Sequence, residues 1–251
     1  MSKQDGAPPA GQWAGGHPKR FYETADVRPE AGGHGIFLDG RPVKTPLKQP
    51  LVLPTHALAD AVAAEWQAQE ERIIAASMPL TKLANTSIDH GHAAFRALVD
   101  EFISYAGADL LCYRAETPEG LVERQVALWD PLLTWVAQSL GARFVVATGI
   151  VHEEQPEQSL KALGAHVEAY DHFRLTVLQA VAALTGSAVI ALALAERRIS
   201  VQEAWTAANV DEDWQIELWG KDDEAESRRV IRRAELDAHD RFMELVLTST
   251  G

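Results

Sequence analysis

The chain has 251 residues, enough for one large domain or two smaller ones with a substantial core. Its 36 acidic residues outnumber the 23 basic ones, and the formal net charge of −13 argues against nucleic acid and anionic membranes as partners. Hydrophobic residues make up 47% of the sequence and charged residues 24%, which is ordinary for a soluble globular protein.

Residues 1–18 contain many glycines and prolines and few apolar side chains, so we expect a disordered tail. They show neither the apolar run of a signal peptide nor the arginines of a mitochondrial presequence. Cys112 is the single cysteine, which excludes an internal disulfide and fits a reducing compartment; we interpret it as a small buried hydrophobe. These features predict a cytoplasmic protein.

A small β region is expected where the ordered chain begins. Its strands are predicted at Arg20–Val27, Ile36–Leu38, Arg41–Thr45 and Leu51–Leu53. The pair Asp39 and Gly40 separates the second strand from the third, and Asp-Gly is favoured in two-residue hairpin turns. Gly32–Gly35 is interpreted as a loop, because no phosphate-binding motif follows these glycines.

From Thr55 the apolar spacing changes to that of helices. Thr55 is suited to an N-cap, and Leu58, Val62 and Trp66 share one face of the helix that follows. Because Trp66 completes this face, we expect it to anchor a core rather than to contact a partner. A second helix is predicted over Pro79–Ile88, with its proline in the first turn.

Helices are predicted for most of the remaining chain, at Ala93–Tyr105, Pro118–Leu140 and Asp222–Leu247. The residues expected to point inward from the second of these are Val122, Val126, Trp129, Leu133 and Val136. Those expected to do so from the third are Ala225, Val230, Ala234, Phe242 and Leu245. Asp109–Arg114 is compatible with a strand or a helical turn, and Phe144–Val151 with an extended connector.

Leu175–Ala195 holds no formal charge over 21 residues, a length that could span a membrane. Thr185, Gly186 and Ser187 interrupt it, and this triplet is typical of a turn between two buried helices. We therefore predict a helix pair in a bundle, with a transmembrane segment as the alternative.

The stretch Ser200–Gly220 is predicted to be one helix, opened by a capping box of Ser200 and Glu203 and closed by Gly220 in a left-handed conformation. Its period places one seam along a single face, formed by Val201, Trp205, Ala208, Glu212, Gln215 and Trp219. Val210, Trp214 and Leu218 point the other way. A helix that is apolar on two sides lies within a core or offers one side to a partner.

The pattern of chemically reactive residues does not favour an enzyme. The histidine pairs His90/His92 and His166/His172 lack the spacing of helical metal ligands, and the sequence has neither an HExxH motif nor a GxSxG motif. The alternative is a small-molecule enzyme with a site between domains, built from Asp89, His90 and the Asp211/Glu212 pair. We predict a protein-binding module without cofactor or metal.

Three segments together resemble one family of chaperones. They are LDGRPVKTP at Leu38–Pro46 with LVLP and AAEW after it, MPLTKLANTSID at Met78–Asp89, and VDEDWQIELWG at Val210–Gly220. The family assembles the soluble catalytic sector of ATP synthase by binding its α subunit. The resemblance in order and spacing extends over nearly all of residues 19–245.

The resemblance implies an α+β N-terminal domain with a small antiparallel sheet, an all-helical C-terminal domain and no catalysis. It implies that the ATP synthase α subunit is the partner and is held soluble until the β subunit takes over the covered surface. The family's acidic position falls on Asp211, with Glu212, Gln215 and Trp219 matching the rest of its motif. The absence of a targeting segment points to a bacterial cytoplasmic member.

Combining motif and pattern, we predict a tail over 1–18, an α+β domain over 19–77 and a helical domain over 78–251. The predicted partner-binding residues are Asp211, Glu212, Gln215, Glu217 and Trp219, and the predicted structural ones are Trp66, Trp205, Gly40 and Gly220. Two client surfaces stay open: the end of the Ser200–Gly220 segment, whose acids suit basic client groups, and the strand edges of the hairpin domain.

Overall fold

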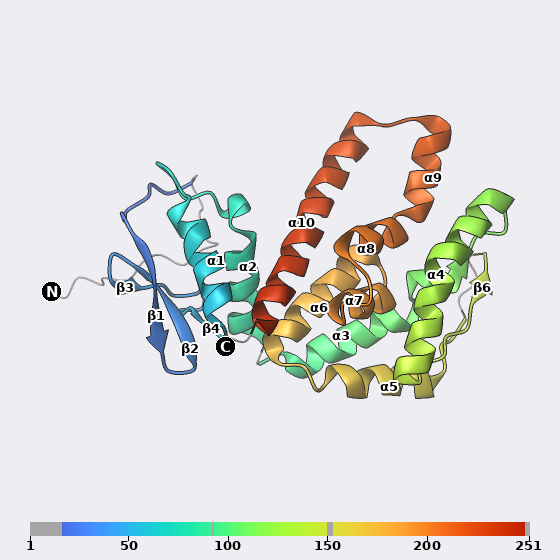
Figure 1. The fold of residues 1–251 in the computed structure, drawn as a ribbon, viewed down its shortest axis with the longest axis horizontal. Coiled ribbons are helices and arrows are strands. Elements are labelled where there is room, and N and C mark those ends of the chain that lie inside the picture. Colours follow the sequence, from blue (N-terminus) through green and yellow to red (C-terminus); the bar gives the residue numbers. More distant parts are fainter. Residues whose placement is uncertain (1–16, 92, 150–152, 249–251) are drawn as a thin grey trace. The chain divides into compact units, whose positions relative to one another are not determined.

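The computed structural model describes residues 17–91, 93–149 and 153–248. A small antiparallel sheet near the N-terminus is followed by helices for most of the remaining chain (Figure 1). The predicted fold class, α+β followed by all-helical, is confirmed. Two compact units are present: one from the described parts of 1–95, 172–177 and 241–251, the other from those of 96–171 and 178–240. The domain boundary after residue 77 stays a prediction.

The sheet of the first unit is centred on one strand. Its members are β1 Ala25–Glu30, β2 Gly33–Leu38, β3 Arg41–Pro42 and β4 Val52–Leu53. β2 pairs antiparallel with each of the other three. Asp39 and Gly40 have φ of 47° and 77° and connect β2 to β3. Positive φ at both positions is the geometry that a two-residue hairpin requires, so the predicted hairpin is confirmed.

The first strand begins at Ala25, and the prediction that it begins at Arg20 is wrong. The Asp39 carboxylate accepts hydrogen bonds from the backbone N–H groups of Glu23, at 3.1 Å, and Thr24, at 2.9 Å. These bonds hold the pKa of Asp39 below its ordinary value. A side chain therefore takes the place of a strand partner before β1 begins.

Gly33–Gly35 belong to β2, and the predicted loop over them is wrong. Gly33 has a φ of 151°, and a Cβ added to it would lie 2.1 Å from the carbonyl oxygen of Leu53. The backbone of β4 can approach β2 only beside a residue without a side chain. The glycines that suggested a loop serve a close contact between strands.

Helix α1 (His56–Gln67) packs on this sheet. The hydroxyl of Thr55 accepts a hydrogen bond from the Leu58 N–H at 3.2 Å, which is the predicted N-cap. Leu58 and Val62 are fully buried and Trp66 is 2% exposed. The Tyr22 hydroxyl donates to the Trp66 carbonyl at 2.7 Å, and burial raises the pKa of Tyr22 to about 12.

Helix α2 (Pro79–Thr86) begins at its proline as predicted, and a residue from α1 caps it. The Glu65 carboxylate accepts hydrogen bonds from the N–H groups of Leu80 and Thr81 at 2.8 and 2.7 Å. Two of the free donors of the first helical turn are thereby satisfied, while burial raises the pKa of Glu65. A 3-10 turn at Ala75–Ser77 precedes α2, and a π-helical turn at Ser87–Gly91 follows it.

The α-helices that follow α2 are α3 Phe95–Gly107, α4 Glu119–Leu140, α5 Glu157–Val167, α6 His172–Thr185, α7 Ala188–Ala195, α8 Val201–Ala208, α9 Val210–Trp219 and α10 Asp223–Leu247. A 3-10 turn at Leu110–Cys112 leads into β5 (Tyr113–Arg114), which pairs in parallel with β6 (Ala147–Thr148). The segment compatible with a strand or a turn therefore contains both.

The uncharged stretch Leu175–Ala195 forms two helices, as predicted. α6 ends at Thr185, and Ser187 caps α7 by accepting from the Ile190 N–H at 3.0 Å. Every residue of α7 is buried. Within the described ranges, no helix has both the length and the apolar character needed to cross a membrane.

The predicted inward faces of α4 and α10 are partly wrong. Val126 on α4 is 45% exposed and Val230 on α10 is 62% exposed. The buried residues of α4 are Leu121, Gln125, Trp129, Leu132 and Val136. Gln125 can be buried on this face because both ends of its side-chain amide are hydrogen-bonded. The buried stripe therefore runs through Gln125 and not through Val126, the adjacent residue that hydrophobicity alone predicts.

Candidate functional site

The segment Ser200–Gly220 is two helices, so the prediction of a single helix is wrong. The capping box of Ser200 and Glu203 opens α8 as predicted. At Asn209 the backbone has φ −120° and ψ 19°, and the side-chain amide donates to the Trp205 carbonyl at 2.7 Å. This side chain competes with the helical pattern and separates α8 from α9, so the predicted seam is interrupted at this point.

The tryptophans of this segment have different surroundings. Trp205 is half-buried, and the guanidinium of Arg229 on α10 lies 5.4 Å from its ring centre. Trp214 lies under Arg124 of α4, at 4.9 Å, and against Gly120. Trp219, at the end of α9, is 82% exposed. Two tryptophans therefore join helices together, and the third projects into solvent.

Asp211 is exposed and is bound to a buried amide. The Gln125 side chain, 2% exposed, donates to the Asp211 carboxylate at 2.7 Å and accepts from the Ala115 N–H at 2.9 Å. Gln125 was not among the predicted site residues. Its signal in the sequence is a glutamine within an apolar stripe, which requires a partner that only the fold supplies.

Two further predicted site acids are paired with arginines of neighbouring helices. Glu212 lies 2.8 Å from Arg229 on α10. Glu217 accepts two hydrogen bonds from Arg124 on α4, at 2.7 and 2.6 Å. These bonds lower the pKa of Glu217. Both carboxylates thus help to orient α9, so a partner would meet charges that are already partly neutralised.

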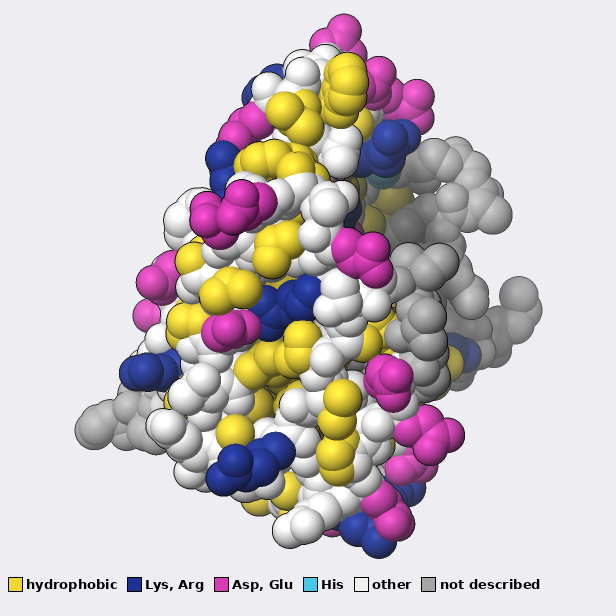
Figure 2. Space-filling view, turned by 90° about the vertical axis from the view of Figure 1, so that its right-hand side faces the viewer, with side chains coloured by type: hydrophobic (Ala, Val, Ile, Leu, Met, Phe, Trp, Pro, Cys, Tyr) yellow, Lys and Arg dark blue, Asp and Glu magenta, His cyan; other side chains and the backbone are white. Residues whose placement is uncertain are grey.

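The end of α9 is the most accessible part of the predicted site. Gln215 is exposed, Leu218 is 56% exposed, and Gly220 follows Trp219 with φ 84° and ψ 179°. The positive φ agrees with a glycine stop, although ψ differs from the predicted left-handed cap. At the top of the face in Figure 2, where α9 and α10 meet, apolar side chains lie among acidic ones.

The residues proposed for the alternative enzyme do not form a site within either unit. Asp89 accepts hydrogen bonds from the Thr45 hydroxyl and from the Leu47 N–H, which ties a loop to the chain after α2. Asp211 and Glu212 belong to the other unit and have the partners given above. His92 lies outside the described residues. Within those residues, no group of His, Cys, Asp and Glu side chains is arranged to hold a metal ion.

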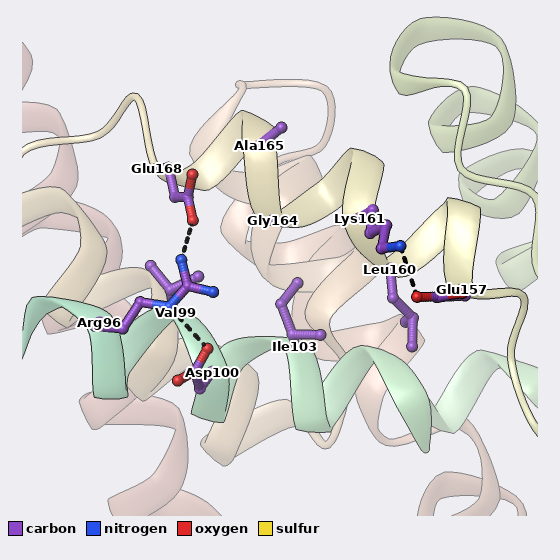
Figure 3. Close-up of a pocket in the computed structure, with 10 residues that line it drawn as sticks. All are labelled: Arg96, Val99, Asp100, Ile103, Glu157, Leu160, Lys161, Gly164, Ala165 and Glu168. Carbon is purple, nitrogen blue, oxygen red and sulfur yellow. Dashed lines mark hydrogen bonds and ion pairs between the residues drawn. The ribbon is translucent and has the colours of Figure 1, made fainter.

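A hollow of 340 Å³ lies between α3 and α5 (Figure 3). Its floor contains Val99, Ile103 and Leu160. Its charged rim is paired with itself: Arg96 lies 3.2 Å from Asp100 and also contacts Glu168, and Lys161 lies 2.6 Å from Glu157. The rim therefore presents no unpaired charge to a small ligand.

The comparisons with known proteins agree with each other. The model of a family described as ATP12 chaperone protein matches residues 19–137. Atp12 from Paracoccus denitrificans is 41% identical with a TM-score of 0.87, covering 91% of this chain and 98% of that one. A mutant form of the same protein is 40% identical at a TM-score of 0.87, covering 91% and 97%. Atu1473 from Agrobacterium tumefaciens, provisionally described as a chaperone, is 43% identical at 0.87, covering 91% and 86%.

Proposed function

Because the chain belongs to the ATP12 chaperone family, we propose that it binds the free α subunit of ATP synthase and keeps it soluble until the β subunit takes its place. The proposal places this activity in the bacterial cytoplasm and involves no catalytic step, cofactor or metal.

The exposure of Trp219 is the observation that supports a client surface at the end of α9. A tryptophan that is 82% exposed removes a large apolar area from water only when a partner covers it. Arg124 and Glu217 fix the orientation of α9 beneath it, so the surface is preorganised. We assign the contacts to Asp211, Gln215, Glu217 and Trp219, and to Glu212 the part of holding α10 against α9.

The proposed activity can be measured as suppression of aggregation. When α subunit is diluted from denaturant in the absence of ATP, an equimolar amount of this protein should keep most of it in the supernatant. A matched reaction contains an unrelated protein that aggregates. Equal protection of both proteins would indicate a general holdase and would contradict the specific assignment.

Two variants of Asp211 distinguish the effect of its charge on α-subunit binding from its effect on the stability of the fold. Asp211→Asn keeps an oxygen that accepts from the buried Gln125 amide, so its melting curve should match that of the unchanged protein. Asp211→Lys removes this acceptor and should lower the free energy of unfolding by about 1–3 kcal/mol. Both variants should bind α subunit more weakly at low salt, the lysine variant most. Unchanged α-subunit binding by folded Asp211→Lys would show that Asp211 does not face the client.

A further inference from the structure

We infer that the outward face of α4 is a second client-binding surface, which takes an apolar segment carrying carboxylates near both of its ends. The inference rests on the proposed function, because the segment is assigned to the same α subunit. The α4 face comprises the residues that line two hollows beside this helix.

Two shallow hollows of 470 and 580 Å³ border this helix and share Asp130, Thr134 and Gln138. The apolar residues of the first are Val126, Ala127, Pro131 and Trp135, and those of the second are Leu133, Ala137, Phe144 and Val146. Figure 2 looks onto the side that carries α4 and β6 and shows apolar side chains over much of it, with basic groups among them. Because the two hollows share these three lining residues, they are adjacent, and one extended or helical segment could occupy both.

The apolar character of the α4 face follows from the way α4 is buried. Gln125 and Trp129 point into the unit, which turns Val126 outward at 45% exposure. Beside α4, Val146 is 47% exposed in the segment just before β6. The Gln155 side chain fixes this segment by accepting from the Val145 N–H at 2.8 Å and donating to the Val145 carbonyl at 3.0 Å. The apolar groups are therefore held in place before any partner binds.

The charges of the α4 face identify the partner's chemistry. Arg143 lines one hollow and Arg198 the other, and both side chains are exposed. Every other lysine and arginine of the second unit is ion-paired. Among the described residues, Arg143 and Arg198 have no such carboxylate partner. Asp130, between them, is paired with the buried Arg114 at 2.7 Å.

The α4 face thus presents two unsatisfied positive charges around an apolar centre, on a chain whose net charge is −13. Charge complementarity requires carboxylates on the partner, and the apolar centre requires aliphatic or aromatic side chains between them. Two basic groups on so acidic a chain give little attraction to an anionic membrane, which leaves a polypeptide segment as the occupant.

The test reverses both charges. Arg143→Glu/Arg198→Glu should bind isolated α subunit about tenfold more weakly at low salt than the unchanged protein, and its binding should depend less on salt. Lys161→Glu/Arg228→Glu is the matched control, since it changes the net charge equally at exposed sites in the same unit. The control should bind within about twofold of the unchanged protein. Melting curves establish that each variant is folded.

The outcomes separate the surface from the function. Unchanged binding by a folded Arg143→Glu/Arg198→Glu, or equal loss in the control, overturns the α4 face while leaving the proposed function in place. If the unchanged protein fails to bind α subunit at all, the proposed function is overturned and the assigned occupant with it.

A photo-crosslinking residue at Val146 tests the partner's chemistry directly, with the same residue at Lys161 as the control position. The α-subunit peptide captured from Val146 should hold apolar residues with Asp or Glu near both ends, and Lys161 should capture little. A captured peptide that is basic, or a crosslinked dimer of this chain in its place, would overturn the inference.

Discussion

Trp66→Ala should lower the free energy of unfolding by about 3–5 kcal/mol, because it removes a large aromatic side chain from a packed core. Trp66 is 2% exposed, lies on the same buried face as Leu58 and Val62, and meets the Tyr22 ring edge-on with ring centres 5.8 Å apart. The cavity would open where α1 packs on the sheet. Urea titration followed by circular dichroism measures the change, and the soluble yield should fall with it.

Trp66→Phe is the control for the loss of the aromatic ring. The indole N–H of Trp66 is buried without a hydrogen-bond partner in the described structure, so phenylalanine removes volume and also removes this unsatisfied donor. Its destabilisation should be clearly smaller than that of alanine. If Trp66→Ala instead melts like the unchanged protein but no longer protects α subunit, Trp66 contacts the client and its assignment to the core is wrong.

Structural features that depend on residues close together in the sequence were predicted correctly. The Asp39-Gly40 turn, the Thr55 cap, the proline start of α2 and the capping box at Ser200 each depend on local geometry that the residues themselves specify. The apolar period then identified the buried face of α1. Local chemistry and period together located a small β region followed by helices, and the family resemblance implied the antiparallel sheet and the division into two domains.

Contacts between distant segments were not predictable in this way. Glu65 caps α2 from 15 residues away, and Asp211 satisfies Gln125 from 86 residues away. Nothing in the local sequence distinguishes these carboxylates from solvent-exposed ones. The same limit explains the error on α4, where Val126 fits an apolar stripe as well as Gln125 does until the partners of Gln125 are known.

The candidate site contains both features that the local sequence predicts and contacts that it does not. The motif from Val210 to Gly220 identified the segment, but not that Asn209 would end α8 before it or that Arg124 would pair with Glu217. The α4 face had no sequence signal at all. An arginine that lacks a carboxylate partner is recognisable only after the acidic side chains around it have been placed.

Asp109 is a buried carboxylate of the second unit, and its hydrogen bonds join the turn at Leu110–Cys112 to helix α7. It is fully buried, and its oxygens accept hydrogen bonds from the N–H groups of Leu111 and Val189, both at 3.0 Å. The second bond caps the start of the buried helix α7. Asp109→Ala should leave these donors without an acceptor and lower the free energy of unfolding at neutral pH by about 3 kcal/mol. Asp109→Asn keeps one acceptor oxygen and should cost less.

The pH dependence of these variants identifies the cause. Burial raises the pKa of Asp109 from 3.8 to about 6, against the opposing effect of its hydrogen bonds. The folded protein therefore holds this proton more tightly than the unfolded chain does. The associated stability is fully present below pH 3.8 and is lost as the pH rises through 6. The unfolding free energy of the unchanged protein minus that of Asp109→Asn should accordingly fall between about pH 4 and pH 7, by up to about 3 kcal/mol. Other titrating groups cancel in this difference, so a flat difference would show that Asp109 keeps an ordinary pKa and that its burial costs the ionised form little.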